Sequence, residues 1–286
     1  MVAALPHPPL ILEFLSAREI SPAALVRLAA RHEVPLVSIC LLPFKALAGE
    51  GVPFADLIDW DLVGDTPNRR ALKRLCEAEG VGIASADPFI LRDESAVEAA
   101  RPALESAAWL GARAVTVIVV EADPTRHAAI LAGFCAAAAD HGLGVLHEHS
   151  PRMAVKTFRE ALAMQRTLAQ PNLRLVVDAL HFFRGDNRLG DLAALQPHEI
   201  GRVQLCDAPR EVLPQGGGYE AFYERMVPGE GGLPLADLLR ALPGNVPLGM
   251  EVPLWAMQEA GVQAAERVAR IVAATRRLIA LAGAAP

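Results

Sequence analysis

The sequence predicts an α/β fold, a single (β/α)8 barrel that spans residues 1–286 as one domain. Short β-rich segments alternate with longer amphipathic segments roughly eight times, which is typical of such a barrel. The β-rich segments are almost wholly apolar, as expected for parallel strands covered on both faces. A doubly wound open sheet also predicts alternation, but no G-x-G-x-x-G follows the first strand and no shift in composition marks a linker.

The first half of the chain is expected to form strands at residues 10–13, 36–41, 81–84 and 114–120. Three of its helices begin with a capping side chain followed by proline, whose missing N–H costs nothing in the first helical turn: Ser21-Pro22, Thr66-Pro67 and Asp123-Pro124. A helix over residues 95–110 contains Pro102, which predicts a late start or a kink. Residues 43–65 form a long loop, of the kind that often covers a site.

The second half repeats the alternation. Strands are expected at residues 144–148, 173–178, 202–205 and 247–251. Helices are expected near residues 155–169, 189–195, 235–242 and 262–281, each following one of these strands. The glycine-rich residues 215–218 are read as a loop and not as a phosphate cradle, because no helix with a suitably placed lysine follows.

Composition and charge narrow the class of function. The length of 286 residues suits one barrel of about 250 residues as well as two ordinary domains. The net charge of -6 gives no sign of a basic surface that would bind nucleic acid or an acidic membrane. No apolar run approaches the roughly 20 residues of a membrane span, and no signal peptide is recognisable. The four cysteines lie far apart, which favours a reducing compartment, so we expect a cytoplasmic enzyme.

Four polar residues end the last four predicted strands: Glu148, Asp178, Gln204 and Glu251. In a parallel barrel, the carboxyl ends of neighbouring strands meet at the active-site face. Three carboxylates without a compensating lysine or arginine would repel one another, and a divalent cation is the simplest compensation. An all-oxygen set suits Mn²⁺ or Mg²⁺ best, with Co²⁺ and Zn²⁺ as other candidates. The alternative is that each acid caps a helix or pairs with a base, and that Gln204 serves backbone groups.

Most of the chain resembles the xylose isomerase-like TIM-barrel family of sugar phosphate isomerases and epimerases. The resemblance rests on residues 143–151, 176–209, 224–243 and 247–254, and it is strongest from about residue 112 to 253. Its most specific elements are D-x-x-H, formed by Asp178 and His181, and P-G-E-G at residues 228–231. The N-terminal third departs from the best-known members, because no histidine follows an early strand.

The resemblance implies a role for each of the four strand-end residues. Glu148, Asp178, Gln204 and Glu251 would bind one divalent metal. Gln204 stands where many members place a histidine, although members that resemble inosose dehydratases and hydroxypyruvate isomerases have glutamine there. Glu148 and Glu251 would also be the catalytic acid/base pair. His181 would contact the substrate, and Arg225, just before P-G-E-G, would bind a substrate oxygen or phosphate.

Three functions remain open at this point. The first is a metal-dependent isomerase or epimerase of a keto-sugar or related hydroxy-ketone in carbohydrate metabolism, acting through an enediolate. The second is a dehydratase or other lyase on a cyclic polyol ketone or keto-glycoside, with the same ligands. The third is a non-catalytic binding barrel. In each case we expect a small polar, carbohydrate-like partner, no nucleic acid and no membrane; a homo-oligomer is compatible with the sequence.

Several other polar and aromatic residues are weaker candidates. His147 and His149 flank Glu148, and because side chains alternate along a strand they are expected to point away from the site. The rival interpretation makes this histidine pair the metal ligands and leaves Glu148 outside. Glu13 ends the first strand near the barrel mouth. Trp60 and Trp255 either wall a pocket or pack. The remaining histidines are read as solvated: His7, His32, His127, His141 and His198.

Overall fold

The computed structural model describes residues 8–42, 60–193 and 195–283. Its sheet is a closed barrel of parallel strands in sequence order, in which β1 pairs with both β2 and β8. The strands are β1 (Leu10–Leu12), β2 (Leu36–Ile39), β3 (Gly82–Leu91), β4 (Ala114–Val119), β5 (Gly144–Glu148), β6 (Leu173–Asp178), β7 (Ile200–Leu205) and β8 (Leu248–Met250). The prediction of a single (β/α)8 barrel is therefore confirmed.

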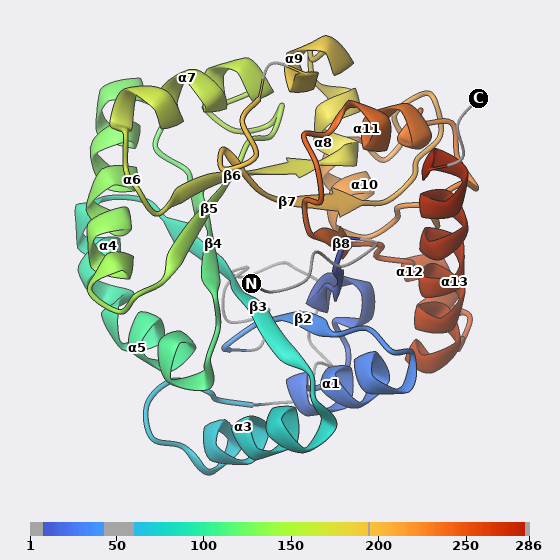
Figure 1. Ribbon diagram of the computed structural model, residues 1–286, viewed down its shortest axis with the longest axis horizontal. Helices are drawn as coiled ribbons and strands as arrows, with labels where there is room; N and C mark the ends of the chain where they lie inside the picture. The colour runs from blue at the N-terminus through green and yellow to red at the C-terminus, as the bar shows by residue number, and fades with distance from the viewer. Residues whose placement is uncertain (1–7, 43–59, 194, 284–286) are drawn as a thin grey trace.

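Helices surround this barrel and cover the outer face of its strands (Figure 1). They are η1 (Phe14–Ala17), α1 (Pro22–Arg31), α3 (Pro67–Glu79), α4 (Glu94–Ala99), α5 (Arg101–Leu110), α6 (Pro124–Ala139), α7 (Phe158–Leu168), α8 (Ala179–Arg184), α9 (Leu189–Ala193), α10 (Gly217–Phe222), α11 (Leu235–Ala241), α12 (Trp255–Glu259) and α13 (Ala264–Gly283). No helix in the described part of the chain is long and apolar enough to cross a membrane.

The predicted capping residues begin their helices as expected. Ser21, Thr66 and Asp123 each accept a hydrogen bond from the backbone N–H three residues later. The helix predicted over residues 95–110 is two helices, because Pro102 lies in the first turn of α5 and α4 ends at Ala99. Most of the long loop predicted at residues 43–65 lies outside the described residues.

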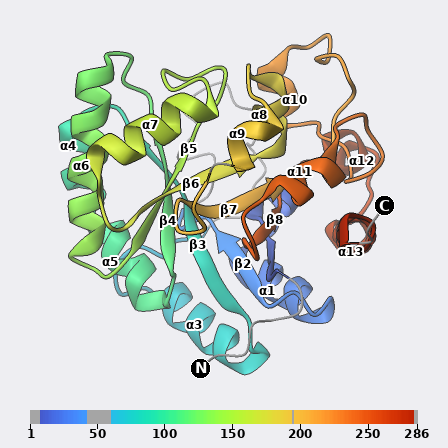
Figure 2. The same cartoon turned by 45° about the horizontal axis from the view of Figure 1, so that its top comes forward.

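Several segments differ from the sequence prediction. The third strand continues from Gly82 to Leu91, well past the predicted end at residue 84. The short helices α8, α10 and α12 were not predicted, because five or six residues are too few to establish a helical period. In particular, residues 217 and 218 of the predicted glycine-rich loop begin α10. Figure 2 shows α8 and α10 together beside the ends of β6 and β7, where α8 and α10 are joined by Arg184 and Glu220.

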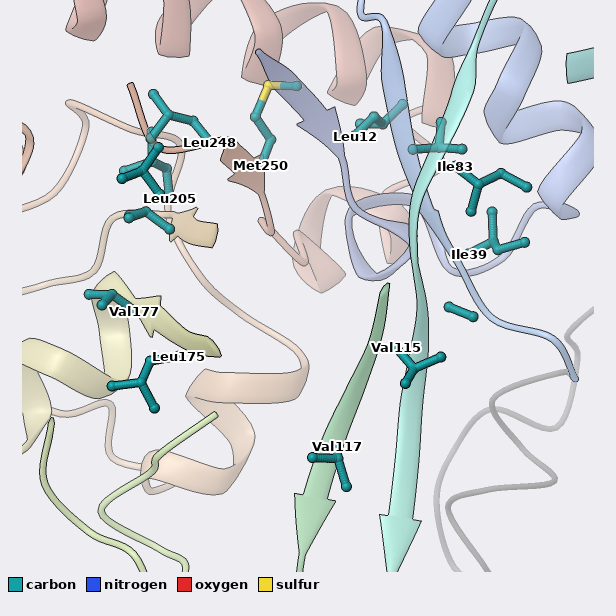
Figure 3. Close-up of a cluster of buried hydrophobic side chains, with 14 of the residues drawn as sticks. Leu12, Ile39, Ile83, Val115, Val117, Leu175, Val177, Leu205, Leu248 and Met250 are labelled. Carbon is teal, nitrogen blue, oxygen red and sulfur yellow. The ribbon is translucent and has the colours of Figure 1, made fainter. Parts of the chain in front are cut away.

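Alternation along the strands separates two packed regions. One set of side chains points outward and packs against the helices, as the close-up in Figure 3 shows for Val115, Val117, Leu175 and Val177. The intervening residues point into the barrel. Near its amino-terminal end they form a small separate apolar cluster of Ala114, Leu146 and Val176. Farther along the strands the inward-pointing residues are polar, and these build the site.

A buried arginine occupies the middle of the barrel. Arg202 on β7 is 1% exposed, and its Nη1 lies 3.2 Å from carboxylate oxygens of both Glu13 and Asp87. It also donates to the hydroxyls of Ser85 on β3 and Thr116 on β4. Burial raises the pKa of Glu13 to about 8, although the charge of Arg202 opposes this shift. Glu13 therefore belongs to a network across the barrel and does not line the cavity above it.

Candidate active site

The strand-end residues predicted from the sequence meet at one end of the barrel. Glu148 and Asp178 are the last residues of β5 and β6, Gln204 lies on β7, and Glu251 follows β8 directly. Gln204 Nε2 donates to Glu251 Oε1 over 2.9 Å. Glu148, Gln204 and Glu251 line one cavity, together with His181. Asp178 is completely buried beside them.

Arg225 lies between two of the carboxylates. Its Nη1 is 2.6 Å from Asp178 Oδ2, and its Nη2 is 3.0 Å from Glu251 Oε2. Its Nε donates to the backbone carbonyl of Ala221, and the residue is only 2% exposed. The expectation that the acidic cluster lacks a compensating base is therefore wrong. The base is Arg225, which lies in a loop 21 positions after Gln204. Because it does not end a strand, it is not among the polar residues found at strand ends.

The three carboxylates differ in their affinity for protons. Burial raises the pKa of Asp178, but the charge of Arg225, the neighbouring His181 and the hydrogen bonds to the carboxylate together outweigh it and lower that pKa to about 2. Burial raises the pKa of Glu251 to about 7, even though Arg225 opposes the shift. The pKa of Glu148 lies well above its usual value because of burial, followed by the charges of Glu251 and Asp178. Glu251 is thus suited to exchange a proton near neutral pH, and Glu148 holds its proton more tightly than a free carboxyl does.

His181 is positioned by the D-x-x-H spacing itself. Asp178 caps α8, since its Oδ1 accepts a hydrogen bond of 2.9 Å from the backbone N–H of His181. This cap turns the His181 ring back toward the cavity, where Nε2 lies 3.5 Å from Glu148 Oε1. Burial lowers the pKa of His181 to about 4, so the ring is neutral near pH 7. Asp178 is therefore both a helix cap and an ion-pair partner, as the alternative interpretation predicted.

The P-G-E-G element folds around an aspartate that the sequence analysis did not single out. Asp207 and Met226 exchange two backbone hydrogen bonds, of 2.7 and 2.8 Å, which fixes Arg225 one residue before the bridge. The carboxylate of Asp207 then accepts from the backbone N–H groups of Gly229 and Leu233. A Cβ atom at Gly231 would lie 2.5 Å from the carbonyl oxygen of Ala208, so glycine is required there. The motif thus holds the loop that delivers Arg225.

The remaining histidine candidates lie on the far side of β5 from the cavity. His147 faces His127 of α6 with their Nε2 atoms 3.4 Å apart, and His149 packs edge-on against Phe158 of α7. Neither lines the cavity. His127 is 1% exposed, so its interpretation as a solvated residue is wrong. It is buried because α6 turns this face toward the sheet.

The two tryptophan candidates pack and do not line the cavity. Trp60 donates its indole N–H to the carbonyl of Cys40, and Trp255 packs at a right angle against Tyr223. Three charged residues that were not predicted also line the cavity, namely Asp87, Arg152 and Arg202. Alternation along β7 offered a signal for Arg202, since it is two residues before Gln204 and therefore on the same face.

The site's chemistry and charge fit one divalent cation. Three carboxylates face one guanidinium, which leaves an excess of two negative charges when all are ionised. The amide oxygen of Gln204 is buried without a hydrogen-bond partner in the described structure. As the described side chains stand, however, no three of His, Cys, Asp or Glu form a ready-made metal cage. The carboxylates are instead engaged with Arg225, Gln204 and His181.

Comparisons with known proteins agree with the fold. The chain is 28% identical over 229 residues to 3-dehydroshikimate dehydratase from Pseudomonas aeruginosa, which covers 73% of this chain and 35% of that protein. The chain therefore spans about a third of that relative's length. Among solved structures, the IolI protein with a bound zinc atom has a TM-score of 0.77 at 17% identity, covering 97% of this chain and all of that one.

Solved sugar epimerases share the same architecture. D-psicose 3-epimerase from Clostridium cellulolyticum H10 has a TM-score of 0.70 at 12% identity, covering 96% of this chain and all of that one. D-allulose 3-epimerase from Methylomonas sp. has a TM-score of 0.67 at 16% identity, covering 96% and 99%. A sequence profile described as the xylose isomerase-like TIM barrel matches residues 44–271, well over half of the chain. The protein therefore belongs to the xylose isomerase-like TIM-barrel family.

Proposed function

We propose that the protein is an isomerase or epimerase of a keto-sugar or related hydroxy-ketone, which moves a proton α to the carbonyl through an enediolate. The observation that carries the proposal is the pair Glu148 and Glu251. Both line the cavity, and burial raises the pKa of both. They extend from β5 and β8, with β6 and β7 between them. A substrate between them would meet one carboxylate on each side, as removal and return of a proton requires.

The other residues of the site orient this pair. Gln204 and Arg225 both bind Glu251, so its carboxylate is held from two directions. His181 stands beside Glu148 as a neutral ring that can donate to or accept from a substrate hydroxyl. Arg225, which also lines the cavity, would bind a substrate oxygen while it stays paired with Asp178. Proton transfer would thus take place within a preorganised set of hydrogen bonds.

The same residues would hold a divalent metal, with Mn²⁺ or Mg²⁺ preferred by the oxygen donors. Its ligands would be Glu148, Asp178, Gln204 and Glu251. When bound, such an ion would polarise the carbonyl and stabilise the charge of the enediolate. Support comes from the partnerless Gln204 oxygen and the zinc atom bound in the similarly folded IolI protein.

A second candidate is a dehydratase built from the same residues. It is favoured by one specific observation, the 28% identity to a 3-dehydroshikimate dehydratase. Loss of a β-hydroxyl begins with the same proton removal, so Glu148 or Glu251 would act as the base. The two reactions then differ in the fate of the enediolate, which either takes back a proton or expels a hydroxide.

One experiment separates the two reactions. The Mn²⁺-loaded protein is incubated in D2O with ketoses, polyol ketones, hydroxypyruvate and 3-dehydroshikimate. NMR follows exchange of the C–H next to the carbonyl, and ultraviolet absorbance follows the conjugated product of water loss. The proposal predicts deuterium incorporation that is lost in Glu148→Gln and Glu251→Gln. Water loss alone would establish the dehydratase instead. If neither reaction is detected, the non-catalytic binding barrel is the remaining function.

A further inference from the structure

Three arginines line the cavity, and two of them are neutralised by carboxylates. Arg225 pairs with Asp178 and Glu251, and Arg202 pairs with Glu13 and Asp87. The third, Arg152, has no carboxylate within ion-pair distance in the described parts of the chain. Its side-chain N–H groups likewise find no hydrogen-bond acceptor among those residues. Within residues 8–42, 60–193 and 195–283, Arg152 is therefore the cavity arginine whose charge has no partner.

The position of Arg152 suits recognition of a ligand. It follows Glu148 by four residues in the loop after β5 and is exposed at the cavity mouth. Its guanidinium carbon lies 5.1 Å from the centre of the Phe222 ring. On its other neighbour, Gly218, even an added Cβ would lie 3.8 Å from the guanidinium carbon. A guanidinium that stacks on an aromatic face keeps its in-plane donors available for an anion.

We propose that Arg152 binds an anionic group, a carboxylate or a phosphate, carried by the substrate. The forked N–H donors of arginine match both groups in geometry. The inner end of the same cavity carries the carboxyl groups of Glu148 and Glu251, the proposed proton-exchanging pair. The substrate would therefore enter with its anionic group at Arg152 and its carbonyl toward the two glutamates. The role of that orientation in catalysis rests on the proposed function, whereas binding of the anion does not.

Three small probes that share a hydroxy-ketone test the proposal: hydroxypyruvate carries a carboxylate, dihydroxyacetone phosphate carries a phosphate, and dihydroxyacetone is neutral. Their dissociation constants are measured by calorimetry on the Mn²⁺-loaded protein. We expect at least one anionic probe to bind about tenfold more tightly than dihydroxyacetone, and the stronger of the two identifies the anion. Arg152→Gln should abolish that preference without changing the affinity for dihydroxyacetone. Arg152→Lys should restore part of it, because it keeps the charge but not the fork.

A matched control is Arg126→Gln, which removes an exposed arginine of α6 that pairs with Glu121 and does not line the cavity. It should leave all three affinities unchanged. A wild-type protein without preference for an anionic probe, or a preference that survives in Arg152→Gln, overturns the proposal. Proton exchange in D2O is measured independently of anion binding. Anion binding that depends on Arg152 without any proton exchange would contradict the proposed reaction and leave the anion site standing.

Discussion

Arg225 connects two carboxylates that would otherwise be buried with nothing to balance their charge. It reaches Asp178 over 2.6 Å and Glu251 over 3.0 Å, and all three residues are largely withdrawn from solvent. A buried ion pair adds little to stability compared with an apolar replacement of both partners. Removal of one partner alone leaves a buried, unpaired charge and lowers the free energy of unfolding strongly. The contribution of Arg225 is therefore best seen when it alone is replaced.

We predict that Arg225→Met lowers the free energy of unfolding by about 3–5 kcal/mol, because it leaves buried carboxylates unpaired. Urea denaturation of the purified variant measures this loss. Arg240→Met is the control, since Arg240 and Asp237 form an exposed pair of 3.0 Å on α11. That pair should be worth no more than about 1 kcal/mol. Equal losses in the two variants would mean that Arg225 does not balance the cluster.

Glu13 makes stability depend on pH. Burial raises its pKa from 4.5 to about 8, so between these values the folded chain holds a proton that the unfolded chain has released. Its contribution is full below pH 4.5 and is lost as the pH rises through about 8. We predict that wild type loses stability relative to Glu13→Gln by up to about 1.4 kcal/mol per pH unit in this window. Denaturation at pH 5, 6.5 and 8 measures the difference.

The control for this pH dependence is Glu77→Gln on the exposed face of α3. Its stability should run parallel to that of wild type across the three pH values. A Glu13→Gln protein that also runs parallel to wild type would show that Glu13 holds no extra proton in the fold.

Among the elements, the loop between β7 and β8 depends on close backbone contact. Gly231 leaves room for a neighbouring carbonyl that a side chain would strike at 2.5 Å, and that contact is with backbone, which cannot simply rotate away. We predict that Gly231→Ala destabilises the protein by about 1–3 kcal/mol. Because the same turn positions Arg225, activity should fall as well. Thermal denaturation and the exchange assay measure both effects.

Gly133 provides the matched control for that substitution. It is exposed within α6, and an added Cβ would meet nothing within 4 Å. Gly133→Ala should therefore stabilise the protein by about 0.5–1 kcal/mol through helix propensity. If both substitutions stabilise, the Gly231 turn is not constrained as described.

The barrel and its strand order were accessible from the sequence because each signal is local. Apolar runs, capping residues before prolines and the polar residues at strand ends need no knowledge of distant partners. The D-x-x-H spacing also has a local cause, since Asp178 caps the helix that carries His181. Arg225 and Arg202 were different, because their partners lie 26 to 189 residues away and only the closed barrel brings them together. Charge balance is therefore the part of the site that needed the structure.

In the molecule as a whole, the charged interior has two levels. Arg202 and its two carboxylates cross the middle of the barrel, and Arg225 with its two carboxylates lies at the carboxyl ends of the strands. Aliphatic strands and surrounding helices enclose both levels (Figure 1). The proposed substrate would thus be held by charge and hydrogen bonds, within walls that contain few aromatic rings. Among the described residues, Glu148 pairs with His181 and with no arginine.

Metal binding at the carboxyl ends of β5 to β8 can be tested without a substrate. Mn²⁺ is titrated by calorimetry into chelator-treated protein, and bound metal is then counted by mass spectrometry. We expect one ion per chain in wild type and in the surface control Glu230→Gln, whose glutamate pairs with Arg270. Glu251→Gln and Asp178→Asn should bind at least tenfold more weakly. A wild-type protein that binds no ion, or a Glu251→Gln protein that binds as tightly as wild type, would show that these residues form no metal-assisted proton-transfer site.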